Sequence, residues 1–146
     1  MDHYTLFQEY LQADHQIDVF YHTLAQALGL SDSALWVLWC LVERGDGCTQ
    51  KDICRQVSIS KQTVHSSVRK LERDGFLSLR PREGREVSLF LTAQGQELVR
   101  EKVLPIMAAE RAAAGGLTEE ELRDMIRLSQ KWLSLFRKAA ASIPKK

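Results

Sequence analysis

The sequence predicts a mainly α-helical fold with one small β-hairpin. Three observations carry this prediction. Hydrophobic residues recur at helical spacing along most of the chain, the spacing changes to alternation after Gly75, and capping residues separate the helical segments. The length of 146 residues and the hydrophobic content of 45% suit one compact unit, so we expect a single domain over residues 1–146.

Two short helices are predicted between Thr49 and Asp74. Thr49 has the hydroxyl of an N-cap, and Asp52 adds negative charge where the helix dipole favours it. A two-residue connection leads to a second N-cap at Ser60, and Gly75 ends the second helix. Two helices joined by so sharp a turn form a helix-turn-helix.

The second of these helices has two chemically different faces. Val64, Val68 and Leu71 form an apolar stripe that would pack on the first helix. The opposite face holds amide, hydroxyl and guanidinium groups that bond to base edges, together with cations that neutralise phosphate. We therefore expect the module to contact double-stranded DNA through Thr49, Lys61, Gln62, Thr63, His65, Ser66, Arg69, Lys70 and Arg73.

A hairpin with a long basic tip follows the second helix. Hydrophobic residues alternate on its return strand, residues 87–91, and the tip at residues 80–85 is too long for a tight two-residue turn. Arginines in such a tip reach a flanking minor groove or the DNA backbone. We interpret the hairpin as a small β-wing whose predicted DNA contacts are Arg82 and Arg85.

The terminal segments carry more apolar surface than a small module can cover. A two-fold partner is the natural place to bury it, and intramolecular packing is the competing account. A symmetric dimer would hold two recognition helices roughly 34 Å apart, which matches one turn of a palindromic operator.

The predicted organisation is a winged helix-turn-helix core flanked by N- and C-terminal dimerisation helices. The core covers residues 31–91, and the dimerisation helices cover residues 1–30 and 118–146, the second opening with a capping box at Thr118. A linking helix and turn occupy residues 92–117. We expect Pro105 to kink or end this helix, which would finish near Arg111.

Four segments resemble the MarR family of bacterial winged helix-turn-helix regulators. GLSDSALWVLWCL at residues 29–41 looks like the family's second helix, and TQKDI at 49–53 like the start of its third. KQTVHSSVRKLERDG at 61–75 looks like its recognition helix, and LFLTAQG at 89–95 like the junction after its wing. The family's wing usually shows Asp-x-Arg where this chain has Glu-Gly-Arg, which makes Arg85 the carried-over wing contact.

The resemblance implies a sequence-specific DNA-binding transcriptional regulator that acts as a homodimer, and it favours repression relieved by a small molecule. It also implies a pocket for a small aromatic or amphipathic effector, often an aromatic acid. A ligand there could change the spacing of the recognition helices through differential binding. The residues that we select as ligand-binding candidates are His15, Asp18, His22, Trp36 and Trp39. The alternative is that the histidines lie at an interface, where neighbouring residues satisfy them, and that the tryptophans belong to the core.

Charge is distributed unevenly along the chain, although the net charge is only +1. Residues 1–48 hold one arginine and seven acidic residues, which gives −6. Residues 49–91 hold nine basic and five acidic residues, giving +4, and residues 92–146 hold ten and seven, giving +3. The central module is therefore suited to phosphate, with strongly salt-dependent binding. A merely solvated charged face and a winged-helix module that binds protein instead of DNA are the competing interpretations.

Other classes of function lack support in the sequence. We find no phosphate loop, nucleophile elbow or clustered acid–base set, so we expect no enzyme. Cys40, Cys48 and Cys54 lack the paired spacing of a zinc site, and we expect no metal or cofactor. For Cys48 two interpretations stay open, an exposed redox-responsive loop thiol beside Arg44 or a reduced thiol without a role. Without a signal peptide or a membrane span, the protein is expected in the cytoplasm.

Overall fold

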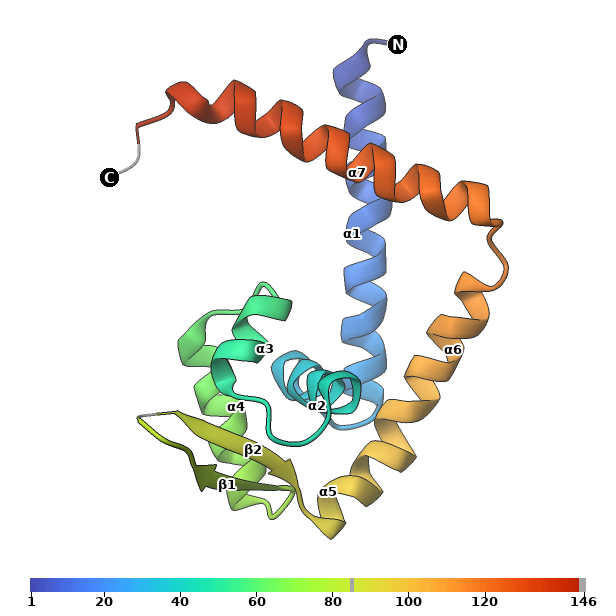
Figure 1. Cartoon of the computed structure of the whole chain (residues 1–146). Helices are drawn as coiled ribbons and strands as arrows, with labels where there is room; N and C mark the ends of the chain where they lie inside the picture. The colour runs from blue at the N-terminus through green and yellow to red at the C-terminus, as the bar shows by residue number, and fades with distance from the viewer. Residues whose placement is uncertain (85, 145–146) are drawn as a thin grey trace. The chain divides into compact units, whose positions relative to one another are not determined.

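The computed structural model describes residues 1–84 and 86–144 and confirms the predicted fold class (Figure 1). Seven α-helices and one two-stranded sheet are present among these residues. The chain divides into two compact units, Met1–Ile106 and Met107–Lys146.

The first unit contains the helix-turn-helix and the wing. Its elements are α1 (His3–Ala27), α2 (Asp32–Arg44), α3 (Gln50–Gln56), α4 (Lys61–Arg73), β1 (Leu77–Pro81), β2 (Val87–Leu91), α5 (Ala93–Leu98) and the π-helix η1 (Val99–Val103). The helix α6 (Leu104–Ala114) crosses the boundary between the units. The second unit continues with α7 (Glu119–Ala139) and the short 3₁₀ helix η2 (Ala140–Ser142).

Side-chain caps begin the helices where the sequence predicts them. Thr49 Oγ1 accepts a hydrogen bond from the amide of Asp52 (3.2 Å), and Asp52 Oδ2 accepts one from the amide of Thr49 (2.9 Å). Asp52 thus completes a capping box, and the bond from the Thr49 amide holds the pKa of its carboxyl below the ordinary value. Ser60 caps α4, and Thr118 with Glu121 forms the predicted capping box of α7.

The wing is an antiparallel pair extended by a third segment that the sequence analysis missed. β1 and β2 pair from Leu77 opposite Leu91 to Pro81 opposite Val87. On the other side of β2, the amide of Leu89 donates to the carbonyl of Cys48 (2.8 Å), and the amide of Gly47 donates to the carbonyl of Leu89 (2.7 Å). The wing is therefore joined by backbone hydrogen bonds to the segment that enters α3.

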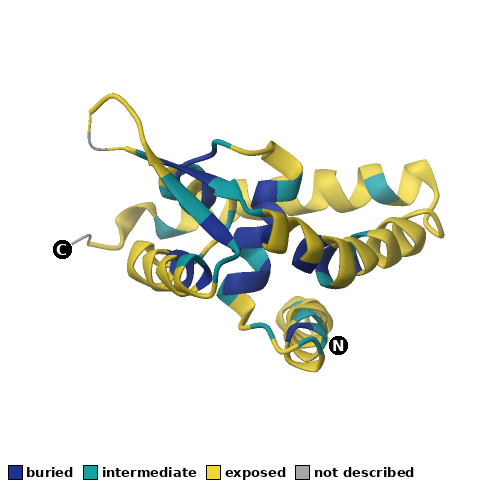
Figure 2. Cartoon of the chain, turned by 90° about the horizontal axis from the view of Figure 1, so that it is seen from below, coloured by how far each residue is buried: buried dark blue, intermediate teal, exposed yellow. Residues whose placement is uncertain are grey.

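The hydrophobic core of the first unit lies where α2, α3, α4 and β2 meet. Its fully buried large side chains include Leu38 on α2, Ile53 on α3, Val64 and Val68 on α4, and Leu89 on β2. Figure 2 colours the ribbon by burial and shows the buried parts, in dark blue, on the strands and the helices beside them. Burial of each such side chain contributes about 1.5–3 kcal/mol relative to exposure. In contrast, Ala25 is the only buried residue of α1, and α7 has none among its described residues.

Helical structure continues through Pro105 to Ala114 instead of ending near Arg111. Pro105 lies in the first turn of α6 and has no amide hydrogen to donate to an earlier carbonyl. The five residues Val99–Val103 before it form a π-helix, in which the Leu104 amide donates to the carbonyl of Val99. A π-helical segment thus precedes Pro105, and the helix continues beyond the proline.

No single helix in the described part of the chain is long and apolar enough to cross a membrane. Only α1 and α2 taken together, with a bend of 93° between them, pass such a test, on length and composition alone.

Gly95 allows α5 to approach the start of the wing. A Cβ atom at this position would lie 2.0 Å from the carbonyl oxygen of Phe76, a distance that backbone atoms cannot accommodate without moving. Thr92 fixes the same approach, because its hydroxyl donates to the carbonyl of Gly75 and accepts from the amide of Gly95.

We predict that Gly95→Ala lowers the free energy of unfolding by about 2 kcal/mol or more, because the added methyl group overpacks the junction. Gln96→Ala is the matched control on an exposed position of α5 and should change this free energy by less than about 0.5 kcal/mol. Urea unfolding followed by circular dichroism measures both. Equal stability of the two variants would contradict the close approach at Gly95.

Candidate nucleic-acid interface

The helix α4 buries one face and exposes the other. Val64, Val68 and Leu71 are buried, as predicted, and α4 packs against α2 and α3. Ser67 lies on the same buried face, where its hydroxyl forms a hydrogen bond with that of Ser33 on α2 (2.5 Å). The rotation of α4 about its axis is thereby fixed by packing and by a hydrogen bond.

The polar face of α4 contains eight of the residues predicted to contact DNA. All are exposed: Lys61, Gln62, Thr63, His65, Ser66, Arg69, Lys70 and Arg73. Two of these cations form intrahelical ion pairs, Arg69 with Glu72 (3.0 Å) and Lys70 with Asp74 (3.5 Å). Exposed pairs of this kind contribute less than about 1 kcal/mol, so a phosphate or base edge can replace the carboxylate.

Other side chains on this face differ in how firmly they are held. His65 Nδ1 lies 3.3 Å from Oε1 of Gln50 on α3. Within the described part of the chain, Lys61, Gln62 and Arg73 have no side-chain partner. Gln62 therefore presents both an amide donor and an amide acceptor to solvent, which is the pair of groups that adenine edges require.

Thr49 differs from the other candidates because it is buried. Its hydroxyl accepts from the Asp52 amide and donates to the Asp52 carboxylate (3.1 Å). The structure thus uses this hydroxyl within the protein, and a DNA contact by Thr49 stays a prediction.

The wing carries its basic residues toward its tip. Arg80 is held over the ring of Phe90, with its guanidinium carbon 4.1 Å from the ring centroid. Arg82 is exposed, and its amide donates to the carbonyl of Glu86 (3.0 Å), which closes the connection between the strands. Arg85, the predicted wing contact, lies outside the described residues.

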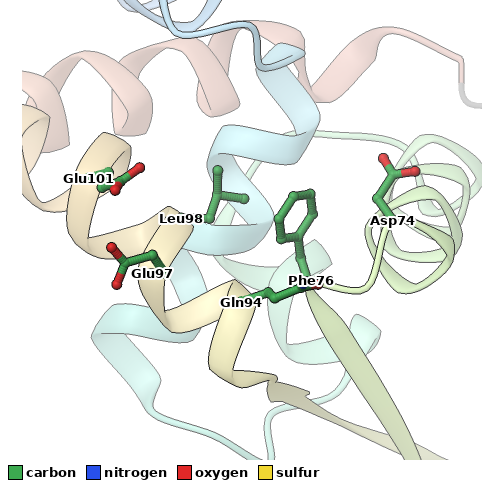
Figure 3. Close-up of a pocket in the computed structure, with 6 residues that line it drawn as sticks. All are labelled: Asp74, Phe76, Gln94, Glu97, Leu98 and Glu101. Carbon is green, nitrogen blue, oxygen red and sulfur yellow. The ribbon is translucent and has the colours of Figure 1, made fainter.

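A cavity of about 350 Å³ lies between α5, η1 and the C-terminal end of α4 (Figure 3). Phe76 and Leu98 lie in its middle, between Asp74 on one side and Glu97 and Glu101 on the other. Hydrogen bonding to Arg100 keeps the pKa of Glu97 below the ordinary value, and its carboxylate stays ionised. These carboxylates repel phosphate, so the exposed face of α4 with the wing is the better candidate for a nucleic-acid interface.

A second cavity, of about 140 Å³, lies between α1 and α2. It contains three of the five predicted ligand-binding residues, Asp18, His22 and Trp36. His15 and Trp39 do not line it: Trp39 is buried behind Trp36, with ring centroids 5.4 Å apart.

Sequence reasoning missed the other residues that line this second cavity: Tyr21, Asp32 and Leu35. Asp32 is the partner of a predicted residue, since His22 Nδ1 lies 2.8 Å from both of its carboxylate oxygens. The only sequence signal for Asp32 was its place in the first turn of α2, where a carboxylate also favours the helix dipole.

The interpretation of Cys48 as an exposed thiol is wrong. Backbone pairing of Gly47 and Cys48 with Leu89 draws the side chain into the core, where it is buried. Burial, together with the negative charge of Asp52, raises the pKa of Cys48 to about 11, and burial raises that of Cys40 to about 11 as well. In the part of the chain that the structure describes, no group of three or more His, Cys, Asp or Glu residues is arranged to hold a metal ion.

Comparison with known proteins identifies the fold independently. The sequence model of the MarR family matches residues 28–86. A MarR family regulator from Neisseria meningitidis is 20% identical, with 99% of this chain and 100% of that chain covered and a TM-score of 0.79. MepR of S. aureus in complex with DNA is 23% identical, with coverages of 93% and 98% and a TM-score of 0.66.

A third solved structure is that of Bordetella bronchiseptica BpsR, which concerns the regulation of its DNA binding by 6-hydroxynicotinic acid. It is 24% identical to this chain, with coverages of 83% and 98% and a TM-score of 0.58. At these identities the likeness to solved structures shows the fold. No curated protein sequence matches the chain.

We predict that thiol reagents label Cys54 first. Cys54 is only half-buried, whereas the raised pKa of Cys40 and Cys48 leaves little thiolate near pH 8, so their reaction should be slower by roughly a hundredfold. Because a raised thiol pKa favours the folded state only while the thiol is protonated, this contribution to stability is lost as the pH rises from about 9 through about 11.

Stopped-flow labelling of the native protein, of Cys54→Ser and of the urea-unfolded chain measures these rates. A fast phase that persists in Cys54→Ser would show that a second thiol is reactive in the folded protein.

Proposed function

We propose that this chain, whose residues 28–86 match the sequence model of the MarR family, is a winged helix-turn-helix transcription regulator of that family that binds a palindromic operator as a homodimer. In this proposal it represses transcription in the cytoplasm until a small effector releases it. Members of this family regulate transcription and are not enzymes. The observation that carries the proposal is the division of α4 into a buried apolar face and an exposed face of hydrogen-bond donors and cations.

The exposed face has the groups that sequence-specific binding requires. Bidentate side chains such as Gln62 and Arg69 suit base edges in a major groove, whereas Lys61 and Arg73 suit phosphates. The wing adds the exposed Arg82 and, in the prediction from sequence, Arg85. Ser33 and the apolar stripe hold the helix that presents these groups.

Solved structures of similar proteins support two parts of the proposal, the binding of DNA and its control by a small effector. MepR has been solved with DNA, and the BpsR structure concerns the control of DNA binding by a small aromatic compound. A Staphylococcus aureus MarR, 17% identical to this chain, has been solved with salicylate and kanamycin. In this chain, the cavity between α1 and α2 is the site that we propose for an effector.

Exposed apolar surface on α1 and on α7 supports a homodimer. On α7 this surface lies on one side of the helix and includes Ile126, Leu133 and Phe136, each roughly half-exposed. On α1 it includes Tyr10, Ile17 and Phe20. Apolar surface of this extent on each helix is typical of an interface rather than of a monomer's exterior.

Two alternatives are less well supported. A redox-responsive regulator needs a reactive thiol, and burial of Cys48 with its raised pKa argues against that residue. A winged module that binds protein instead of DNA would not need the exposed cations on α4, and it would not show the steep salt dependence that phosphate contacts produce.

We predict that Gln62→Ala reduces discrimination between operator and scrambled DNA by roughly 1–3 kcal/mol, because a base-edge contact is lost. Arg82→Ala should instead weaken binding to both DNAs to a similar extent, because a wing contact to backbone or groove shape carries little sequence information. The operator is obtained by selection from random duplexes, and fluorescence anisotropy at fixed salt measures both affinities.

Retained discrimination in Gln62→Ala would remove that residue from base recognition. Failure of the unaltered protein to select any sequence would refute the proposed function.

We predict that Phe136→Asp dissociates the homodimer, because a carboxylate would be buried in an apolar interface. Ser134→Asp introduces the same charge two residues away, on the opposite side of α7, and should leave the dimer intact. Light scattering across a range of protein concentrations gives the molar mass of both variants. Two dimeric variants would show that this face of α7 lies outside the interface.

A further inference from the structure

We propose that the cavity between α1 and α2 binds a small organic cation that carries one ring, such as an aromatic amine, rather than an aromatic acid. The residues that carry this inference are Asp18, His22 and Asp32 with the rings of Tyr21 and Trp36. The regulatory role of such a ligand rests on the function proposed above, whereas binding to the cavity does not.

The charged groups of the cavity favour a cation. Asp18 and Asp32 contribute two carboxylates, His22 is the only titratable base, and no lysine or arginine lines the cavity among the described residues. If His22 is protonated, the lining carries one net negative charge, and if it is neutral the lining carries two. In neither state does the cavity offer an excess positive charge to the carboxylate of an aromatic acid.

The carboxylates differ in availability. Both carboxylate oxygens of Asp32 lie 2.8 Å from His22 Nδ1, so this carboxylate already has the imidazole as its partner. Asp18 has no hydrogen-bond or ion-pair partner within the described part of the chain. An ammonium group of a ligand would therefore pair with Asp18, one turn of α1 before His22.

The aromatic rings provide a second, independent preference for a cation. The centroids of Tyr21 and Trp36 are 5.1 Å apart with planes inclined at 54°, and the Trp39 ring, which does not line the cavity, lies 6.1 and 5.4 Å from them. Faces of Tyr and Trp carry negative electrostatic potential, and aromatic rings grouped in this way are the usual receptors for organic ammonium groups.

The size of the cavity limits the ligand. Its volume is about 140 Å³, and a buried apolar cavity of roughly 150 Å³ accommodates one benzene molecule. Leu35 supplies an apolar wall against which a ring can pack. One ring with a short aminoalkyl arm reaching Asp18 therefore fits the space, whereas fused polycyclic compounds exceed it.

Three compounds of nearly equal shape and different charge test the inference: benzylamine, benzyl alcohol and benzoate. Isothermal titration calorimetry of the full-length protein without DNA should show the tightest binding for benzylamine and the weakest for benzoate. Asp18→Asn should weaken the binding of benzylamine by about fivefold, since an exposed ion pair contributes up to about 1 kcal/mol. The same variant should leave the affinity for benzyl alcohol unchanged. Asp14→Asn, which removes a charge one turn earlier on α1 and does not line the cavity, should leave all three unchanged.

The inference would be overturned by benzoate binding as tightly as benzylamine, or by the absence of a heat signal from benzylamine at millimolar concentration. An equal effect of Asp14→Asn and Asp18→Asn would also overturn it, because the preference would then come from the general acidity of α1. Circular dichroism confirms that each variant is folded.

Release from operator DNA is measured separately by anisotropy. Release by benzoate but not by benzylamine would leave the proposed function standing and overturn the charge assignment. Calorimetry without DNA still tests the cavity if no operator is found.

Discussion

Burial of one side of α4 is the constraint on which the rest of the structure depends. Val64, Val68 and Leu71 lie at spacings of four and three residues, and a helix of 3.6 residues per turn places them in one stripe. Once this stripe packs against α2 and α3, its packing determines which of the remaining positions of α4 are exposed to solvent. Gln62, Arg69 and their neighbours face solvent because of packing on the other side of the helix.

The sequence was sufficient for those features whose causes are local. Caps at Thr49, Ser60 and Thr118 depend on residues three positions apart, and the burial of α4 depends on positions within two turns. The same reasoning could not find the pairing of Cys48 with Leu89, because two residues in extended conformation have no periodicity to detect. Cys48 was therefore interpreted as a loop residue, although its backbone belongs to the wing.

The cavity between α1 and α2 shows the same limit of local reasoning. Asp18, His22 and Trp36 are candidates for the pocket that the family resemblance implies, but Tyr21 and Asp32 complete the cavity only when α1 packs on α2. The pairing of His22 with Asp32 joins residues ten positions apart across the turn between these helices. That contact changes the charge of the cavity. The expectation of an aromatic acid as effector comes from the family resemblance and does not take the Asp32 carboxylate into account.

The helix α2 contacts both the cavity and the helix α4. On α2, Asp32, Leu35 and Trp36 line the cavity, while Ser33 among them forms the hydrogen bond to Ser67 on α4. Any displacement of the first turn of α2 must therefore either carry α4 with it or break a contact on the buried side of the recognition helix. A ligand changes DNA affinity only if it binds one arrangement of this turn better than another, so the coupling is limited by that difference in affinity. Ser33 and the apolar stripe are the contacts through which a displacement of this turn would reach α4.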